Sequence, residues 1–158
     1  DLTREFFFPD DLDVEFVGHP NWFFRISKYT LPFLNSPYVP KTWFLDELPS
    51  IPDNLSDYVL KPLFSFAGQG VIINPTRRDV ESVASPEQFI LQKKVRYAPV
   101  IETPNEPAKF EFRMMFLWKD NEPRPTLVNN LIRLSKADMV GVRYNVNKDW
   151  VGGSVGFF

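Results

Sequence analysis

The stretch from Tyr58 to Ile73 constrains the fold of this chain more than any other. It is an apolar run with one lysine near its end, a loop of small residues with two glycines, and a second apolar run. This pattern predicts a strand, a loop and a second strand. Lys61 would then bring its ammonium group close to the backbone N–H groups of the loop, and both kinds of group suit the phosphates of a nucleotide. The alternative is a plain β-hairpin with a lysine in solvent at a strand end.

The composition favours one soluble globular domain. The 158 residues are 44% hydrophobic and 24% charged, and a formal charge of −2 gives no electrostatic argument for nucleic acid or an anionic membrane. The chain has no cysteine, which excludes disulfides and thiolate metal sites, and it has no apolar run long enough to span a membrane. We therefore expect a cytoplasmic protein. Aromatic residues reach 16%, and we expect most of them in the core.

The order of the remaining segments predicts an α+β fold of mostly antiparallel sheets with few helices. One helix is expected after Asn21, a suitable N-cap, and Pro32 should kink or end it. Residues 1–20 are expected to form an N-terminal extension or edge segment, and its single histidine, His19, cannot form a metal site alone. Further strands are expected at 38–45, 89–95, 110–118 and 126–134, and a short helix at 77–83.

In its segment order the chain resembles an ATP-grasp domain, the fold of ATP-dependent carboxylate–amine ligases. The motifs that carry the resemblance follow one another as Lys28, 38–42, 59–62, 66–71, 90–95 and 110–113. The nearest branch contains the ribosomal-protein glutamate ligases and the lysine-biosynthesis ligases. In that branch an arginine-bearing strand is followed by a second arginine, an Arg-x-Asn segment and a Gly-Gly pair, which here look like Arg113, Arg133, Arg143 to Asn145, and Gly152 with Gly153.

The resemblance implies that residues 21–158 form an ATP-binding domain of two small α+β subdomains, with a hinge near 92–95. ATP with Mg²⁺ would activate a small-molecule or peptide carboxylate as an acyl-phosphate, which an amine then attacks. Arg113, Arg133, Arg143 and Asn145 would be the catalytic residues. The nucleotide would be held by Lys28, Lys61, Gly68, Gln69, Gly70, Gln92, Lys93, Lys94, Val95 and Glu102, with the backbone of Lys94 and Val95 reading the adenine.

The metal ligands of the family are the main departure. The expected late Asp and the Glu-x-Asn motif do not occur before Phe158, and the nearby Asp138 and Asp149 are not assigned. We therefore expect either a portion of a longer ligase or a relative that binds nucleotide without complete chemistry. The alternatives are a non-catalytic nucleotide-binding or interaction module on the same fold, and an aromatic-rich β-domain that binds peptide or carbohydrate. At single positions, Lys28 also fits a solvated helix lysine, and Arg113 and Arg133 also fit surface ion pairs.

Overall fold

A computed structural model of the chain describes Asp13 and residues 27–157. The expected helix start at Asn21 and the lone His19 lie outside the described residues. Within them the chain is mostly antiparallel β-structure with a few short helices. This confirms the coarse fold class predicted from the sequence, while the ATP-grasp arrangement stays a prediction. No helix of the described part is long and apolar enough to cross a membrane.

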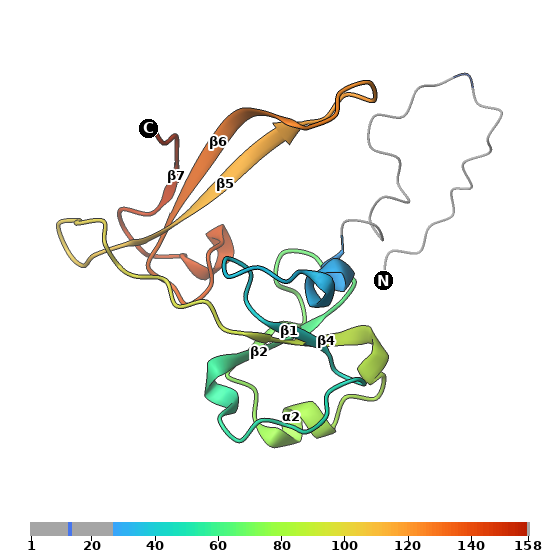
Figure 1. Ribbon diagram of the computed structural model, residues 1–158. Helices are drawn as coiled ribbons and strands as arrows, with labels where there is room; N and C mark the ends of the chain where they lie inside the picture. Colours follow the sequence, from blue (N-terminus) through green and yellow to red (C-terminus); the bar gives the residue numbers. More distant parts are fainter. Residues whose placement is uncertain (1–12, 14–26, 158) are drawn as a thin grey trace. The chain divides into compact units, whose positions relative to one another are not determined.

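The chain divides into two compact units, Asp1–Lys94 and Val95–Phe158, which we call unit 1 and unit 2 (Figure 1). Each unit contains one antiparallel sheet, of four strands in unit 1 and three in unit 2. The division falls within the range 92–95 where a hinge is predicted. Movement at that point stays a prediction, and the two units are described separately below.

Unit 1 is built around a four-stranded sheet. In spatial order its strands are β1 (Thr42–Phe44), β4 (Phe89–Lys93), β2 (Tyr58–Pro62) and β3 (Ile72–Ile73). β2 and β3 form the predicted hairpin, with Val59 opposite Ile73 and Leu60 opposite Ile72. β4 pairs with both β1 and β2, so the strand predicted at 89–95 is the centre of the sheet.

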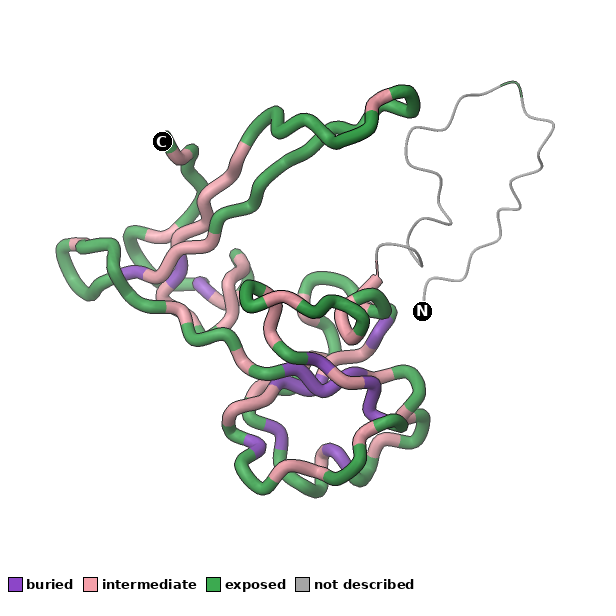
Figure 2. Tube along the Cα trace, in the orientation of Figure 1, coloured by how far each residue is buried: buried purple, intermediate pink, exposed green. Residues whose placement is uncertain are grey.

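One face of this sheet carries the larger part of the core. Leu60 and Leu91 lie opposite each other on it and are fully buried. Figure 2 shows buried backbone gathered at the central strands of this sheet. Burying a leucine side chain contributes about 1.5–3 kcal/mol, so this pair supplies much of the stability of unit 1. The buried side chains that pack with them come from the loop after β1, from a 3₁₀ turn and from the helix α2 (Arg77–Glu81), and are Leu45, Leu55 and Val80.

The helix α2 confirms the short helix predicted at 77–83, and its start is capped on both sides. The Thr76 hydroxyl accepts a hydrogen bond from the Asp79 N–H, and the Asp79 carboxylate accepts one from the Thr76 N–H at 2.7 Å. This is a capping box, which satisfies two backbone donors that the helix leaves unpaired. Hydrogen bonds from the Thr76 side chain and backbone hold the pKa of the Asp79 carboxyl below its ordinary value.

The opposite face of the sheet has an apolar half made by Phe44, Ile90 and Leu63. The 3₁₀ helix η1 (Lys28–Phe33) covers it and packs against it through Leu31. η1 ends one residue after Pro32, as expected for a residue that cannot donate a backbone hydrogen bond. The remaining 3₁₀ turns of unit 1 are η2 (Leu55–Asp57) and η3 (Pro86–Gln88).

Unit 2 is a long hairpin with a short third strand. β5 (Lys109–Leu117) pairs with β6 (Thr126–Ser135), which confirms the two strands predicted there, and β6 pairs with β7 (Gly152–Ser154). The 3₁₀ turn η4 (Val142–Tyr144) lies between β6 and β7. Most residues of the three strands are exposed or only partly buried.

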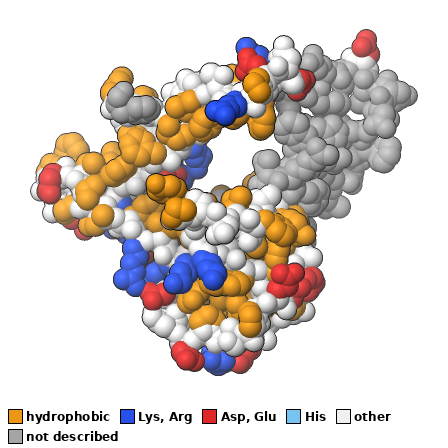
Figure 3. All heavy atoms as spheres, in the orientation of Figure 1, with side chains coloured by type: hydrophobic (Ala, Val, Ile, Leu, Met, Phe, Trp, Pro, Cys, Tyr) orange, Lys and Arg blue, Asp and Glu red, His pale blue; other side chains and the backbone are white. Residues whose placement is uncertain are grey.

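The expectation that most aromatic residues lie in the core is wrong for the described residues, among which Phe44 is the only buried aromatic. The core of unit 1 is mainly aliphatic. In unit 2 the aromatic side chains stand on a sheet with no covering layer among the described residues, and Figure 3 shows hydrophobic side chains along the β5–β6 hairpin. Phe112, Phe116 and Trp118 are each about half exposed or more.

Candidate functional site

The most distinctive polar group of the described chain lies on the η1 side of the unit 1 sheet. Residues that face one another across antiparallel strands share a face, and side chains alternate along each strand. The registers Thr42 opposite Gln92 and Lys61 opposite Ile90 therefore place Lys61, Gln92 and Thr42 beside the apolar half of that face. The structure thus brings together two predicted binding residues, Lys61 and Gln92, and adds Thr42.

A chain of hydrogen bonds fixes Lys61 in this position. Its Nζ donates to the Gln92 Oε1 at 2.5 Å, and the Gln92 Nε2 donates to the Thr42 Oγ1 at 2.9 Å. The Thr42 hydroxyl in turn donates to the Pro40 carbonyl at 2.8 Å. Gln92 is buried, so its amide has one favourable orientation, with the oxygen toward the lysine. The buried amide therefore acts as a fixed support for the ammonium group.

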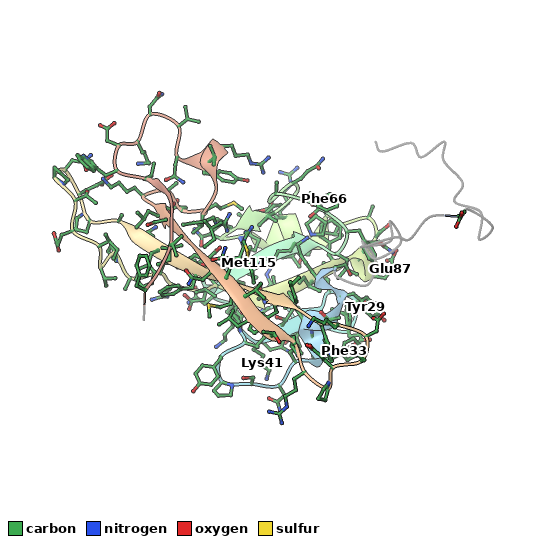
Figure 4. The ribbon with its side chains drawn as sticks, turned by 90° about the horizontal axis from the view of Figure 1, so that it is seen from above. Tyr29, Phe33, Lys41, Phe66, Glu87 and Met115 are labelled. Atoms are coloured by element: carbon green, nitrogen blue, oxygen red, sulfur yellow. The ribbon has the colours of Figure 1, made fainter. Side chains whose placement is uncertain are left out.

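Lys28 reaches the same region from η1. Its Nζ donates to the Ser65 carbonyl at 3.1 Å and to the Ser65 hydroxyl at 2.9 Å. Aromatic packing holds η1 on the sheet, because the rings of Tyr29 and Phe33 lie 5.0 and 5.6 Å from that of Phe44. Tyr29 and Phe33 lie near each other on η1 in Figure 4. Lys28 is therefore anchored at the start of the glycine loop.

The two lysines form a positive site that has no matching negative charge in the described part of the chain. Burial, and then the charge of Lys28, lower the pKa of Lys61, and burial lowers the pKa of Lys28. Among the described residues, no carboxylate lies within ion-pair distance of either ammonium group. Partly buried charges usually have a paired partner. Two such lysines with only neutral partners therefore favour the binding of an anion.

The glycine loop has the backbone conformation that such a site requires. Ala67, Gly68 and Gly70 all have positive φ angles, of 48°, 78° and 70°. A Cβ on Gly70 would lie 2.8 Å from the Pro62 Cγ, so only glycine fits without a shift. The turns of the loop use the N–H of Gln69 and of Val71. Among the described residues, the N–H groups of Gly68 and Gly70 make no backbone hydrogen bond, which leaves them for a ligand.

The segment predicted to bind adenine already uses several of its hydrogen-bond donors within the protein. The Lys93 N–H donates to the Lys41 carbonyl and the Lys94 N–H to the Asp57 carbonyl, both at 2.8 Å. Both N–H groups are engaged within unit 1, and the reading of adenine by the backbone of Lys94 stays a prediction. The Lys94 ammonium also donates, to the Ser56 carbonyl and to Asn74, and the register places the Lys93 side chain on the other face from Lys61. The reading of adenine by Val95, which is half exposed, stays a prediction.

In unit 2, two of the three predicted arginines lie near a carboxylate that the sequence reasoning missed. Glu111 lies opposite Arg133 across β5 and β6, and its Oε1 accepts from the Arg133 Nε at 3.0 Å and from the Nη2 as well. The Arg113 Nη2 lies 3.9 Å from the same oxygen. The Tyr97 hydroxyl donates to the Glu111 Oε2 at 3.4 Å, and burial, then Glu111, raises the pKa of Tyr97. The ion pair that the sequence left open for Arg133 is therefore present.

The remaining predicted residues of unit 2 lie in its loops. Arg143 stacks on the ring of Tyr144 at 4.6 Å. Asn145 is buried, with its oxygen accepting from the Lys136 N–H at 2.9 Å and its Nδ2 donating to the Gly141 carbonyl at 2.8 Å. This amide closes its own loop, and it is not carried into the proposal below. Glu102 is exposed and has a neighbour, Ile101, that pairs with Ala108.

The structure adds four residues to those predicted from the sequence: Ser65, Thr42, Glu111 and Tyr97. Thr42 lies inside a motif quoted for the resemblance and Ser65 directly precedes another, but their hydrogen bonds depend on contacts between segments far apart in the chain. The sequence did indicate Glu111 as a neighbour of Arg113, because residues two positions apart lie on the same face of a strand. The partner of Glu111 could not be found without the register of β6.

The described residues do not form a ready-made Mg²⁺ site. No group of three or more histidine, cysteine, aspartate or glutamate side chains lies together in the described part of the chain. Mg²⁺ binds oxygen ligands, mainly carboxylates and phosphates. No step proposed below is therefore routed through a metal.

The chain was also compared with known proteins. No protein-family model, curated protein or solved structure matches it. The candidate site in unit 1 is therefore argued from its own geometry, and the ATP-grasp resemblance stays a prediction from the order of the segments.

Proposed function

We propose that unit 1 binds the phosphates of ATP between Lys28, Lys61 and the glycine loop. The observation that carries the proposal is the pair of partly buried lysines that have neutral hydrogen-bond partners and no carboxylate in ion-pair distance among the described residues. A polyphosphate would supply the missing negative charge. Its oxygens would accept from both ammonium groups and from the loop N–H groups of Gly68 and Gly70.

Each group has a distinct part in this proposal. Lys61 provides a charge at a fixed place, because Gln92 and Thr42 orient it. Lys28 provides a second charge and joins the site to Ser65 at the start of the loop. The loop can approach phosphate closely because glycine has no side chain at two of its positions. Together these groups recognise phosphate and leave the choice of nucleobase to other residues.

The proposed reaction rests only on the resemblance to ATP-grasp ligases. By analogy with ATP-grasp ligases, the bound ATP would phosphorylate a carboxylate, and an amine would attack the acyl-phosphate. Arg113, Arg133 and Arg143 stay the predicted catalytic arginines; the Arg113 side chain is 51% exposed, while Glu111 compensates the charge of Arg133. The second candidate is a module that binds the nucleotide and performs no transfer.

The test is isothermal titration calorimetry of the full chain with ATP and, separately, with inorganic tripolyphosphate. We expect both to bind, and Lys61→Met to weaken each. The loss should be on the order of 1.5–3 kcal/mol, the usual value of a hydrogen bond to a charged group, or roughly ten- to a hundred-fold in affinity. Lys28→Met should have a smaller effect of the same sign.

The matched control is Lys93→Met, which removes the same charge from the opposite face of the same sheet. We expect it to leave tripolyphosphate binding unchanged. Circular dichroism should show that all three variants keep the fold. The proposal would be rejected by wild-type protein that binds neither ligand, or by a loss with Lys93→Met as large as that with Lys61→Met.

A further inference from the structure

The outer edge of β5 is a feature of unit 2 that the proposed function does not use. β5 is the first strand of the sheet β5-β6-β7, and β6 pairs with it on one side only. Among the described residues, its other edge is engaged at one end, where Ala108 exchanges two backbone hydrogen bonds with Ile101. The edge beyond that point presents unpaired N–H and C=O groups, which readily pair with another strand.

Several side chains along this edge are exposed to solvent. Phe112 and Met114 are 49% and 41% exposed, and the Arg113 side chain is 51% exposed. Exposed edges are commonly blocked by prolines, bulges or inward-pointing charges. The pairing of β5 with β6 is irregular only between Met115 and Phe116, near the far end of the strand, where β6 carries the extra residue Val128. A flat stretch with alternating apolar and charged residues is left between Phe110 and Met114.

We propose that β5 pairs with β5 of a second copy of this chain, antiparallel, about a two-fold axis at Phe112. In this register Phe112 faces Phe112 of the second copy. Glu111 faces Arg113 of the second copy on both sides of the axis, and Phe110 faces Met114 in the same way. Opposite charges and apolar pairs directly across strands each stabilise a sheet. The edge is thus complementary to itself, as a two-fold interface requires.

The charge pattern selects this register over its neighbours. A two-fold axis at Arg113 would place two guanidinium groups opposite each other, and an axis at Glu111 would place two carboxylates opposite each other. Like charges directly across strands are destabilising. Registers centred between two residues would set Glu111 and Arg113 opposite phenylalanine or methionine. An axis at Phe110 would pair Lys109 with Glu111, but it would place the second copy opposite Ala108, where Ile101 already pairs. The axis at Phe112 pairs Glu111 with Arg113 on both sides and lies on the open part of the edge.

The paired edges would join the two sheets and their apolar faces. Phe110 and Phe112 lie on one face, with their rings 5.2 Å apart and edge to face. Leu134 and Ile132 lie opposite them on β6, so they share that face. An axis perpendicular to the sheet keeps this face on the same side in both copies. The dimer would therefore carry one continuous aromatic row across its centre.

The first experiment is multi-angle light scattering on the full chain at high micromolar concentration. We expect a mass of twice the 18.4 kDa of the single chain for the wild type. Phe112→Lys should give the single-chain mass, because two ammonium groups would meet at the axis. The control is Val128→Lys, since Val128 is 52% exposed on the same hairpin but lies on β6, away from the edge. It should stay dimeric.

The second experiment tests the register with single cysteines, which the chain otherwise lacks. Phe112→Cys should form a disulfide-linked dimer on mild oxidation, because directly opposite Cα atoms lie about 4.5–5.5 Å apart. Met114→Cys should not, since the two cysteines would be displaced by four residues, or about 13 Å along the strand. A single-chain mass for the wild type, a dimer unaffected by Phe112→Lys, or equal cross-linking of both cysteine variants would each overturn the proposal.

Discussion

Unit 1 and unit 2 contain strands of similar sequence but differ in what covers them. β4 and β5 both carry large apolar residues, yet Ile90 and Leu91 of β4 are fully buried while Phe112 and Met114 of β5 are close to half exposed. Loops and short helices cover both faces of the unit 1 sheet. Unit 2 is held mainly by the ladder between β5 and β6. An apolar strand therefore indicates a core only when the chain also supplies the layer that packs on it.

The same contrast holds for charge. In unit 1, Lys61 is partly buried and its nearest partner is a neutral amide. In unit 2, Arg133 is also partly buried, but Glu111 accepts two hydrogen bonds from it. A compensated charge supports the sheet that it lies on. An uncompensated one favours a ligand of opposite sign, and this difference directs the proposal to unit 1.

The largest expected effect tests where the core lies. Leu91→Ala should destabilise unit 1 by about 2–5 kcal/mol, the usual cost of removing a buried leucine side chain and leaving a cavity. Hydrogen exchange of the β4 amides in the full chain would measure it, since each unit can open separately. The matched change in unit 2 is Leu127→Ala on β6, where the side chain is 40% exposed. A loss in unit 2 as large as that in unit 1 would contradict the contrast.

The next effect compares one glycine of each unit. Gly70→Ala should cost about 1–3 kcal/mol, because its φ of +70° suits glycine and the new Cβ would meet Pro62. Gly153→Ala should change stability far less, since its φ is not in the left-handed region and its nearest contact would be 3.4 Å. Thermal unfolding would give both values. Gly70→Ala should also weaken tripolyphosphate binding, and equal melting temperatures for the two variants would argue against a strained loop.

The sequence predicts features that depend on neighbouring residues better than features that depend on residues far apart in the chain. The hairpin at Tyr58 to Ile73 and the strands β4, β5 and β6 depend on local alternation and turn residues, and they were predicted. Burial was not. Phe112 and Ile90 are both apolar residues in predicted strands, and only the tertiary structure shows which one is covered.

The site divides in the same way. Lys61 and the glycine loop lie within one predicted hairpin, so the sequence could place them together. Gln92 was predicted only from its place in the motif order, and its bond to Lys61 joins residues 31 positions apart. The Lys94 N–H looked available but bonds Asp57, because the sequence does not show how η2 meets the end of β4. Asn145 likewise fits an Arg-x-Asn motif, while its amide closes a local loop.

The smallest predicted effect is the pH dependence of tripolyphosphate binding, which tests the difference in charge between the two units. The pKa of Lys61 is lowered by burial and by Lys28, so this lysine loses its proton at a lower pH than an ordinary lysine. Phosphate binding needs the charged form. The affinity for tripolyphosphate should therefore fall as the pH rises through the lowered pKa, below the range where free lysine titrates. Lys61→Arg should remove most of the fall because a guanidinium stays charged, leaving a smaller part from Lys28.

Stability should change with pH in the opposite direction when no ligand is present. Between the lowered pKa of Lys61 and the ordinary lysine value, the unfolded chain binds more protons than the folded one. The free energy of unfolding should therefore rise with pH in that window, and Lys61→Arg should flatten the rise. Calorimetry and urea unfolding over the same alkaline range would measure the two slopes. If affinity and the free energy of unfolding changed with pH in the same direction, the proposed role of Lys61 would be wrong. An affinity that stays constant up to the pH where free lysine titrates would mean that Lys61 is an ordinary solvated lysine. Either result would remove the charge that distinguishes unit 1.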